Sequence, residues 1–160
     1  MSEQFVKQSE EFWYKLLYPN YNVDVQQYYK SDFRVRDDSR AHRVADIFPF
    51  LEGELTLSYI LPGAITAWHR HKEQTDYWIV VKGHLRVGLQ AGREEPRFEC
   101  LNEFNPRVLQ IPPLVWHGHK NLGNDVAVLL YYTTHKYNLD DEERIPWNHF
   151  GESLWEVEKK

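Results

Sequence analysis

Histidines in two short segments are the side chains best suited to chemistry in this sequence. His69 and His71 are separated by one residue, and Asp76 follows five positions after the second. A further pair, His117 and His119, has the same spacing. In a β-strand, residues two apart point to the same side of the sheet. If the two segments lie on neighbouring strands, their imidazoles and the Asp76 carboxylate meet in one place.

Imidazole nitrogens and a carboxylate oxygen are ligands that borderline divalent ions prefer. The candidate ligands are His69, His71, Asp76 and His117. The ion would be Fe, Mn, Ni, Zn or Cu, because the donor types suit each of them. His119 either replaces His117 in this set or covers the pocket. The competing interpretation is a group of hydrogen-bonded histidines inside a barrel, with Asp76 neutralising one of them.

The strands that would carry these residues are visible as alternating apolar and polar positions. Such alternation is typical of strands with one buried face. It occurs at residues 33–36, 54–59, 84–90 and 126–133. The last run is apolar on both faces, which favours a central strand. Gly and Pro separate the runs at 62–63, 82–83, 91–92, 112–113 and 123–124. Many short strands at this spacing predict an all-β antiparallel sandwich or barrel.

The two ends of the chain differ from this pattern. Residues 9–17 predict a short helix with one apolar face, within an N-terminal arm at 1–30. Ser9 is its expected N-cap. The segment 138–160 is acidic and is expected to lie on the surface as a solvated face. No repeat or linker-like stretch interrupts the sequence, so we expect a single domain over 1–160.

Composition limits the classes of function. The chain has 160 residues and a net charge of −5, whereas nucleic-acid binding usually requires a basic surface. No apolar run reaches the roughly 18 residues of a membrane span, and the N-terminus lacks an apolar signal-peptide core. The single cysteine, Cys100, fits a reducing compartment. We therefore expect a cytoplasmic protein that acts on a small molecule.

The first histidine segment resembles the first conserved motif of the cupin superfamily. The matching residues are Gly63, His69, His71 and Gly83. Asp76 stands where cupins usually have Glu. The second cupin motif matches in part, at Pro112, His117 and Asn121. The resemblance implies a double-stranded β-helix, or jelly-roll barrel, over about residues 50–137.

Within the cupins, the chain resembles dTDP-4-dehydrorhamnose 3,5-epimerases and their relatives in polysaccharide biosynthesis. The segments that carry this likeness are AWHRHKEQTDYWIVVKG (67–83), IPPLVWHGHKNLG (111–123) and YNLDDEERIPW (137–147). The resemblance implies epimerisation or isomerisation of a keto sugar or nucleotide sugar by a homodimer. It assigns the catalytic base to His69, a second pocket histidine to His117 and the proton donor to Tyr131.

Three positions depart from the epimerase pattern. Thr66 and Val87 stand where that family has an arginine and an aspartate, and Asp76 lies near its lysine position. The loss of two cations removes charge that would stabilise an enolate. Metal-binding cupins have an acidic ligand at the position of Asp76, so the departures favour a metal site. Alternative functions are a metal-dependent dioxygenase or lyase, and a sugar-binding protein without catalysis.

Other side chains near the histidines are candidates for substrate binding. They are Trp68, Trp78, Arg86, Trp116 and His119. Indole rings stack on sugars or bases, and a guanidinium can bind phosphate through two hydrogen bonds. Any one of these aromatic residues could equally fill the barrel. Arginines that alternate along a strand, such as Arg36, more often face solvent.

Overall fold

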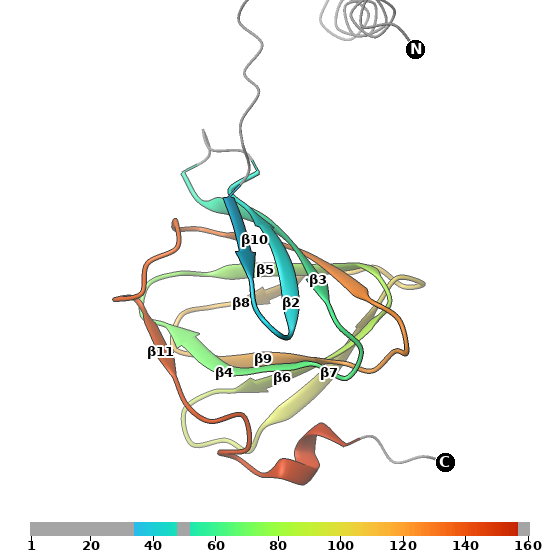
Figure 1. Ribbon diagram of the computed structural model, residues 1–160. Helices are drawn as coiled ribbons and strands as arrows, with labels where there is room; N and C mark the ends of the chain where they lie inside the picture. Colours follow the sequence, from blue (N-terminus) through green and yellow to red (C-terminus); the bar gives the residue numbers. More distant parts are fainter. Residues whose placement is uncertain (1–33, 48–51, 157–160) are drawn as a thin grey trace, which may run out of the picture. The chain divides into compact units, whose positions relative to one another are not determined.

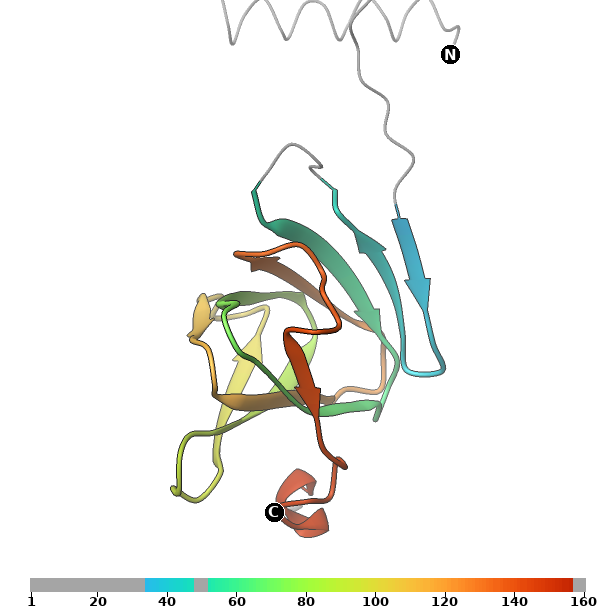
Figure 2. The ribbon, with the colours of Figure 1, turned by 90° about the vertical axis from the view of Figure 1, so that its left-hand side faces the viewer.

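The computed structural model describes residues 34–47 and 52–156 (Figures 1 and 2). These residues belong to the second of two units into which the chain divides, Phe33–Lys160. The helix expected over 9–17 and the arm 1–30 lie outside the described residues. In the described part, the regular elements are β-strands and one short 3₁₀-helix, which confirms the all-β prediction. None of the described residues forms a helix long and apolar enough to cross a membrane.

The strands form two antiparallel sheets that face each other. One sheet has the order β1 (Arg34–Asp37), β2 (Ala41–Ala45), β3 (Glu54–Ile60), β10 (Ala127–Thr133), β5 (Asp76–Lys82) and β8 (Leu109–Ile111). The other has the order β11 (Glu142–Arg144), β4 (Ile65–His71), β9 (Trp116–Asn121), β6 (His84–Gln90) and β7 (Arg97–Asn102). Together they make the jelly-roll barrel expected from the sequence (Figure 1).

The strand that is apolar on both faces, β10, lies inside the six-stranded sheet. It pairs with β3 along one edge and with β5 along the other. Leu129 on its inner face is 1% exposed, and Leu130 on its outer face is partly buried. The prediction of a central strand at this position is therefore confirmed.

The inside of the barrel is apolar at one end and polar at the other. Ile60 and Ala127 pair at one end of β3 and β10, where both are fully buried in the hydrophobic core. At the opposite end Glu54 pairs with Thr133, and both of these polar residues are also buried. Buried polar groups need partners. Glu54 forms an ion pair with Arg36, and the barrel therefore contains a polar chamber beside its apolar core.

The sheets extend beyond the range 50–137 that the resemblance implies. β1 and β2 add two strands to the edge of the six-stranded sheet before that range begins. β11 adds a strand to the five-stranded sheet after the range ends. The acidic tail therefore contributes to the sheet, whereas the sequence analysis expected a solvated surface segment.

An aromatic cluster joins the end of the tail to the outer face of the five-stranded sheet. Trp155, in the 3₁₀-helix Glu152–Trp155, is 1% exposed and lies 4.9 Å from Trp68 between ring centroids. Its ring also meets Phe98 edge to face at 5.3 Å. The acidic character of the tail hid this contribution, because the buried ring of Trp155 lies near the end of a segment rich in charged residues.

Candidate functional site

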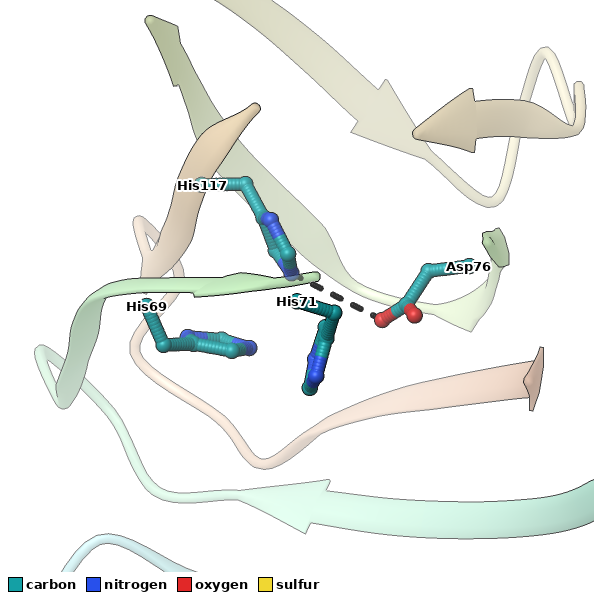
Figure 3. Close-up of side chains that lie close together, drawn as sticks. All are labelled: His69, His71, Asp76 and His117. Atoms are coloured by element: carbon teal, nitrogen blue, oxygen red, sulfur yellow. Dashed lines mark ion pairs between the residues drawn. The ribbon is translucent and has the colours of Figure 1, made fainter. Parts of the chain in front are cut away.

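Three histidines and one aspartate converge inside the polar end of the barrel (Figure 3). His69 and His71 come from β4, His117 from β9 and Asp76 from the start of β5. One potential ligand atom from each residue lies within 4.8 Å of the others. The structure thus brings together the four residues selected from the sequence as metal ligands.

The pairing of β4 with β9 explains how the imidazoles meet. His69 is directly opposite His117, and their ring centroids are 4.2 Å apart. The register of β4 against β9 shifts between Thr66 and His69. In a regular strand, residues three apart point to opposite faces, but because of this shift Thr66 and His69 both line the same cavity. The strands also approach closely at Gly118. A Cβ atom there would lie 2.6 Å from the Cα of Ala67.

Asp76 is held by neutral donors on two sides. One carboxylate oxygen accepts a hydrogen bond of 2.6 Å from Gln74, and the other accepts one of 3.1 Å from the indole of Trp78. The second oxygen also lies 3.6 Å from Nε2 of His117. Burial raises the pKa of Asp76, but the neighbouring His117, His71 and Gln74 outweigh this effect and lower it overall. The carboxylate is therefore charged at neutral pH.

The histidines on β4 are neutral at pH 7. Burial, followed by the proximity of His117 and His71, places the pKa of His69 well below its ordinary value. Burial also lowers the pKa of His71, although Asp76 partly opposes the shift. A neutral imidazole has a free lone pair, so each ring can accept a proton or bind a metal ion.

The backbone also fixes the orientation of the His117 ring. Its Nδ1 lies 2.9 Å from the carbonyl oxygen of Val115 and donates to it. Its Nε2 is buried, has no hydrogen-bond partner and is directed toward Asp76. A buried ring nitrogen without a partner is costly, and a bound ion or ligand group would satisfy it.

A cavity of about 530 Å³ opens beside this cluster. Tyr131, the expected proton donor, lines it together with Trp78 and His119. Burial raises the pKa of Tyr131, so its phenol stays protonated. Arg36 and Arg43 add positive charge to the wall of the cavity, and Arg43 also contacts Asp38 at 3.2 Å.

Two of the five residues proposed for substrate binding line the cavity, and the other three do not. Trp78 and His119 line it, and their rings are in edge contact with centroids 5.5 Å apart. Trp68 and Trp116 are each adjacent in sequence to an inward histidine. They do not line the cavity, because successive side chains of a strand point to opposite faces.

Contacts on the outside of the barrel account for these three residues. The indole of Trp68 donates to the carbonyl of Trp147, and Arg70 lies over the ring of Trp116 at 4.5 Å. Arg86 donates to the carbonyl of Leu154 at 3.1 Å. Trp68, Trp116 and Arg86 are therefore corrected from substrate-binding candidates to residues that pack the outer surface and the C-terminal segment.

Several residues that line the cavity were not selected from the sequence. They are Arg36, Arg40, Arg43, Glu54, Glu142 and Arg144. The first three lie on or beside the β1–β2 hairpin, and the last two lie on β11. The alternation around Arg36 predicted a strand but did not show which face is inward. No motif spacing pointed to β11.

The neutral buried histidines make stability dependent on pH. Burial, followed by Arg43, lowers the pKa of His119 to about 3, and the pKa values of His69 and His71 are also lowered. Below about pH 6.5 the unfolded chain binds protons that the folded chain does not. We therefore expect the free energy of unfolding of chelator-treated protein to fall as the pH is lowered below about 6.5. The decrease is up to about 1.4 kcal/mol per pH unit for each of these histidines.

Urea unfolding between about pH 7 and pH 5 measures this slope. His119→Gln removes one of the three histidines and should make the slope shallower, while His149→Gln, at an exposed position, should leave it unchanged. Stability that rises as the pH falls through this range would contradict the prediction.

One family model and several known proteins are similar to this chain. The model described as FdtA: WxcM-like, C-terminal matches residues 49–149, which include both histidine segments and β11. The probable low-salt glycan biosynthesis epimerase Agl13 of Haloferax volcanii is 34% identical over 133 residues, or 73% of this chain and 85% of that protein. The spore coat polysaccharide biosynthesis protein SpsL of Bacillus subtilis is 38% identical over 104 residues, or 60% of this chain and 69% of that protein.

A solved structure with similar sequence has the same fold. It is a dTDP sugar isomerase from Desulfovibrio desulfuricans G20, with a TM-score of 0.60 and 28% identity. The similarity covers 78% of this chain and 88% of that one. The likeness to a protein named as a probable epimerase and to one named as an isomerase therefore extends over most of the two-sheet barrel.

Proposed function

Because the chain belongs to the family described as FdtA, WxcM-like C-terminal, we propose that it catalyses the epimerisation or isomerisation of a keto sugar. The observation that carries this proposal is the pair of neutral imidazoles, His69 and His71, in a cavity that Tyr131 also lines. These groups are what enolisation requires, namely a base and a proton donor.

The reaction begins with removal of a proton from the carbon beside the ketone. His69 accepts this proton, because its lowered pKa leaves the imidazole neutral. Tyr131 returns a proton from its phenol, which its raised pKa keeps protonated. Return of the proton to the opposite face of the same carbon gives an epimer. Return to the former carbonyl carbon, with transfer of the proton of the adjacent hydroxyl to the enolate oxygen, moves the ketone and gives an isomer.

The negative charge that develops on the enolate oxygen also needs stabilisation. The four clustered residues fit a divalent ion. Ligand atoms each about 2.1 Å from one ion lie at most about 4.2 Å apart, so the observed limit of 4.8 Å is only about half an ångström larger. Bound by His69, His71, Asp76 and His117, the ion would polarise the carbonyl oxygen as a Lewis acid. An imidazole that binds the ion has no lone pair left to accept a proton, so the role of His69 as the base and its role as a ligand are alternatives. Tyr131 would be the proton donor in either case.

We further propose that the sugar is carried on a nucleotide. Arg36 and Arg43, which pair with Glu54 and Asp38, line the cavity, and guanidinium groups are well suited to bind phosphate. The isomerase from Desulfovibrio desulfuricans is named for a dTDP sugar, which supports the same class of substrate. The expected homodimer and the cytoplasmic location stay predictions.

Solvent exchange tests the proposed function. We expect the protein to incorporate deuterium from D₂O into a dTDP-4-keto-6-deoxyhexose at a carbon beside the ketone, observed as loss of a proton NMR signal. Metal analysis of protein purified without chelator is expected to show about one divalent ion per chain. Absence of exchange with several nucleotide-linked keto sugars would contradict the reaction, and failure to bind any ion on titration would contradict the metal.

A second candidate is a metal-dependent dioxygenase or lyase. The observation that favours it is the set of three imidazoles and one carboxylate, which suits Fe(II) as well as ions without redox chemistry. Oxygen consumption after loading with Fe(II), in the presence of small carbonyl or aromatic compounds, distinguishes the dioxygenase from the epimerase.

A further inference from the structure

Asp141, in the segment just before β11, is fixed against the turn that follows β4. Its Oδ1 accepts hydrogen bonds from the backbone amides of Lys72 and Glu73, at 3.1 and 3.0 Å. Its own carbonyl oxygen accepts a further bond from the amide of Lys72. These contacts hold the Asp141 carboxylate against the turn that follows His71 and restrict its rotation.

The second oxygen of this carboxylate faces the cluster. Oδ2 of Asp141 lies 3.5 Å from Nδ1 of His71, and the two side chains are only 14% and 9% exposed. Neither buried atom has a hydrogen-bond partner. An acceptor and a ring nitrogen that are both buried and face each other need only a small approach to form a hydrogen bond.

We propose that Asp141 is a positioning residue that keeps the proton of His71 on Nδ1. With the proton there, the lone pair of His71 is on Nε2. His117 has the same arrangement, because its Nδ1 donates to the carbonyl of Val115 and its Nε2 is directed toward Asp76. In both rings, the hydrogen-bond partner of Nδ1 selects the tautomer, and Nε2 is then able to bind a metal ion or a ligand group.

The C-terminal segment therefore belongs to the site as well as to the sheet. The register of β11 with β4 places Glu142 opposite His71, so docking of this strand carries the neighbouring Asp141 into position. The use of His71 as a base or as a metal ligand rests on the proposed function. The tautomer of His71 does not, because it can be observed in the protein without substrate or metal.

Asp141→Asn separates the two roles of the carboxylate. The amide oxygen can still accept the backbone hydrogen bonds of Lys72 and Glu73, whereas the NH₂ group would now donate to Nδ1 of His71. We expect ¹⁵N NMR of metal-free wild-type protein to show His71 protonated at Nδ1, and that of Asp141→Asn to show it protonated at Nε2. His71→Gln identifies the signals.

Asp140→Asn is the matched control, because it removes the same charge from the adjacent, exposed position. This variant should retain the wild-type tautomer. Wild-type His71 protonated at Nε2, or one unchanged tautomer in wild type and Asp141→Asn, would overturn the proposal. The wild-type spectrum is sufficient for this test even if the variant fails to fold.

A Co(II) titration gives a second readout. We expect Asp141→Asn to bind Co(II) about 10–100-fold more weakly than wild type, because a carboxylate that accepts the proton of a ligating imidazole raises the basicity of that ligand. Asp140→Asn should bind like wild type. Equal Co(II) affinities in all three proteins would contradict the positioning role. Wild-type protein that binds no Co(II) but shows the Nδ1 tautomer would contradict the metal in the proposed function and leave Asp141 as the residue that orients His71.

Discussion

His69→Gln is expected to slow deuterium incorporation into a nucleotide-linked keto sugar by about 10²–10⁴-fold, the usual contribution of a general acid–base group. Glutamine is similar in size to histidine, but its amide cannot accept a proton at neutral pH. The loss is expected for either role of the side chain, since His69 is opposite His117 and belongs to the metal-ligand set. The measurement is the initial rate of exchange by proton NMR.

His149→Gln is the control for this variant, because His149 is exposed and does not line the cavity. It should exchange at the wild-type rate. Thermal unfolding of both variants checks that the barrel remains folded. Exchange by folded His69→Gln at the wild-type rate would contradict the assignment of His69.

Trp155→Ala is expected to lower the free energy of unfolding by about 3–5 kcal/mol, the usual cost of removing a large buried aromatic ring. The ring is 1% exposed and packs against Trp68 and Phe98. Its indole also donates to the carbonyl of Trp147 at 3.0 Å, so the substitution leaves that acceptor without this partner. Urea unfolding measures the change.

Leu139→Ala provides the comparison within the same C-terminal segment. Leu139 is 69% exposed, so its truncation should change the free energy of unfolding by less than about 0.5 kcal/mol. Equal, small effects of both substitutions would mean that the aromatic cluster does not anchor the tail to the sheet.

The four candidate metal ligands could be predicted from the sequence because the geometry that brings them together is mostly local. Spacing of two residues directs His69 and His71 to one face of a strand regardless of the rest of the fold. The resemblance to the cupin motifs then related this pair to Asp76 and His117. The alternation along residues 126–133 predicted a central strand for a similar reason, since both of its faces are apolar.

The substrate-binding candidates show the limit of this reasoning. Proximity in sequence to an inward histidine selected Trp68 and Trp116, although alternation within a strand turns adjacent side chains to the opposite face. Trp68 packs instead beneath Trp155, which is 87 positions later in the chain. Arg36 was expected to face solvent, because alternation alone does not say which side of a strand is covered.

The strand pattern, the four candidate metal ligands and the resemblance to a sugar epimerase family follow from the order of the amino acids alone. The surroundings of these four residues, including the arginines of the β1–β2 hairpin and Asp141 beside His71, became visible in the folded chain. The physical reason is the range of the interactions. Side-chain direction along a strand depends on the nearest residues, whereas the partner of a buried polar group is chosen by the docking of distant strands, such as β11 on β4.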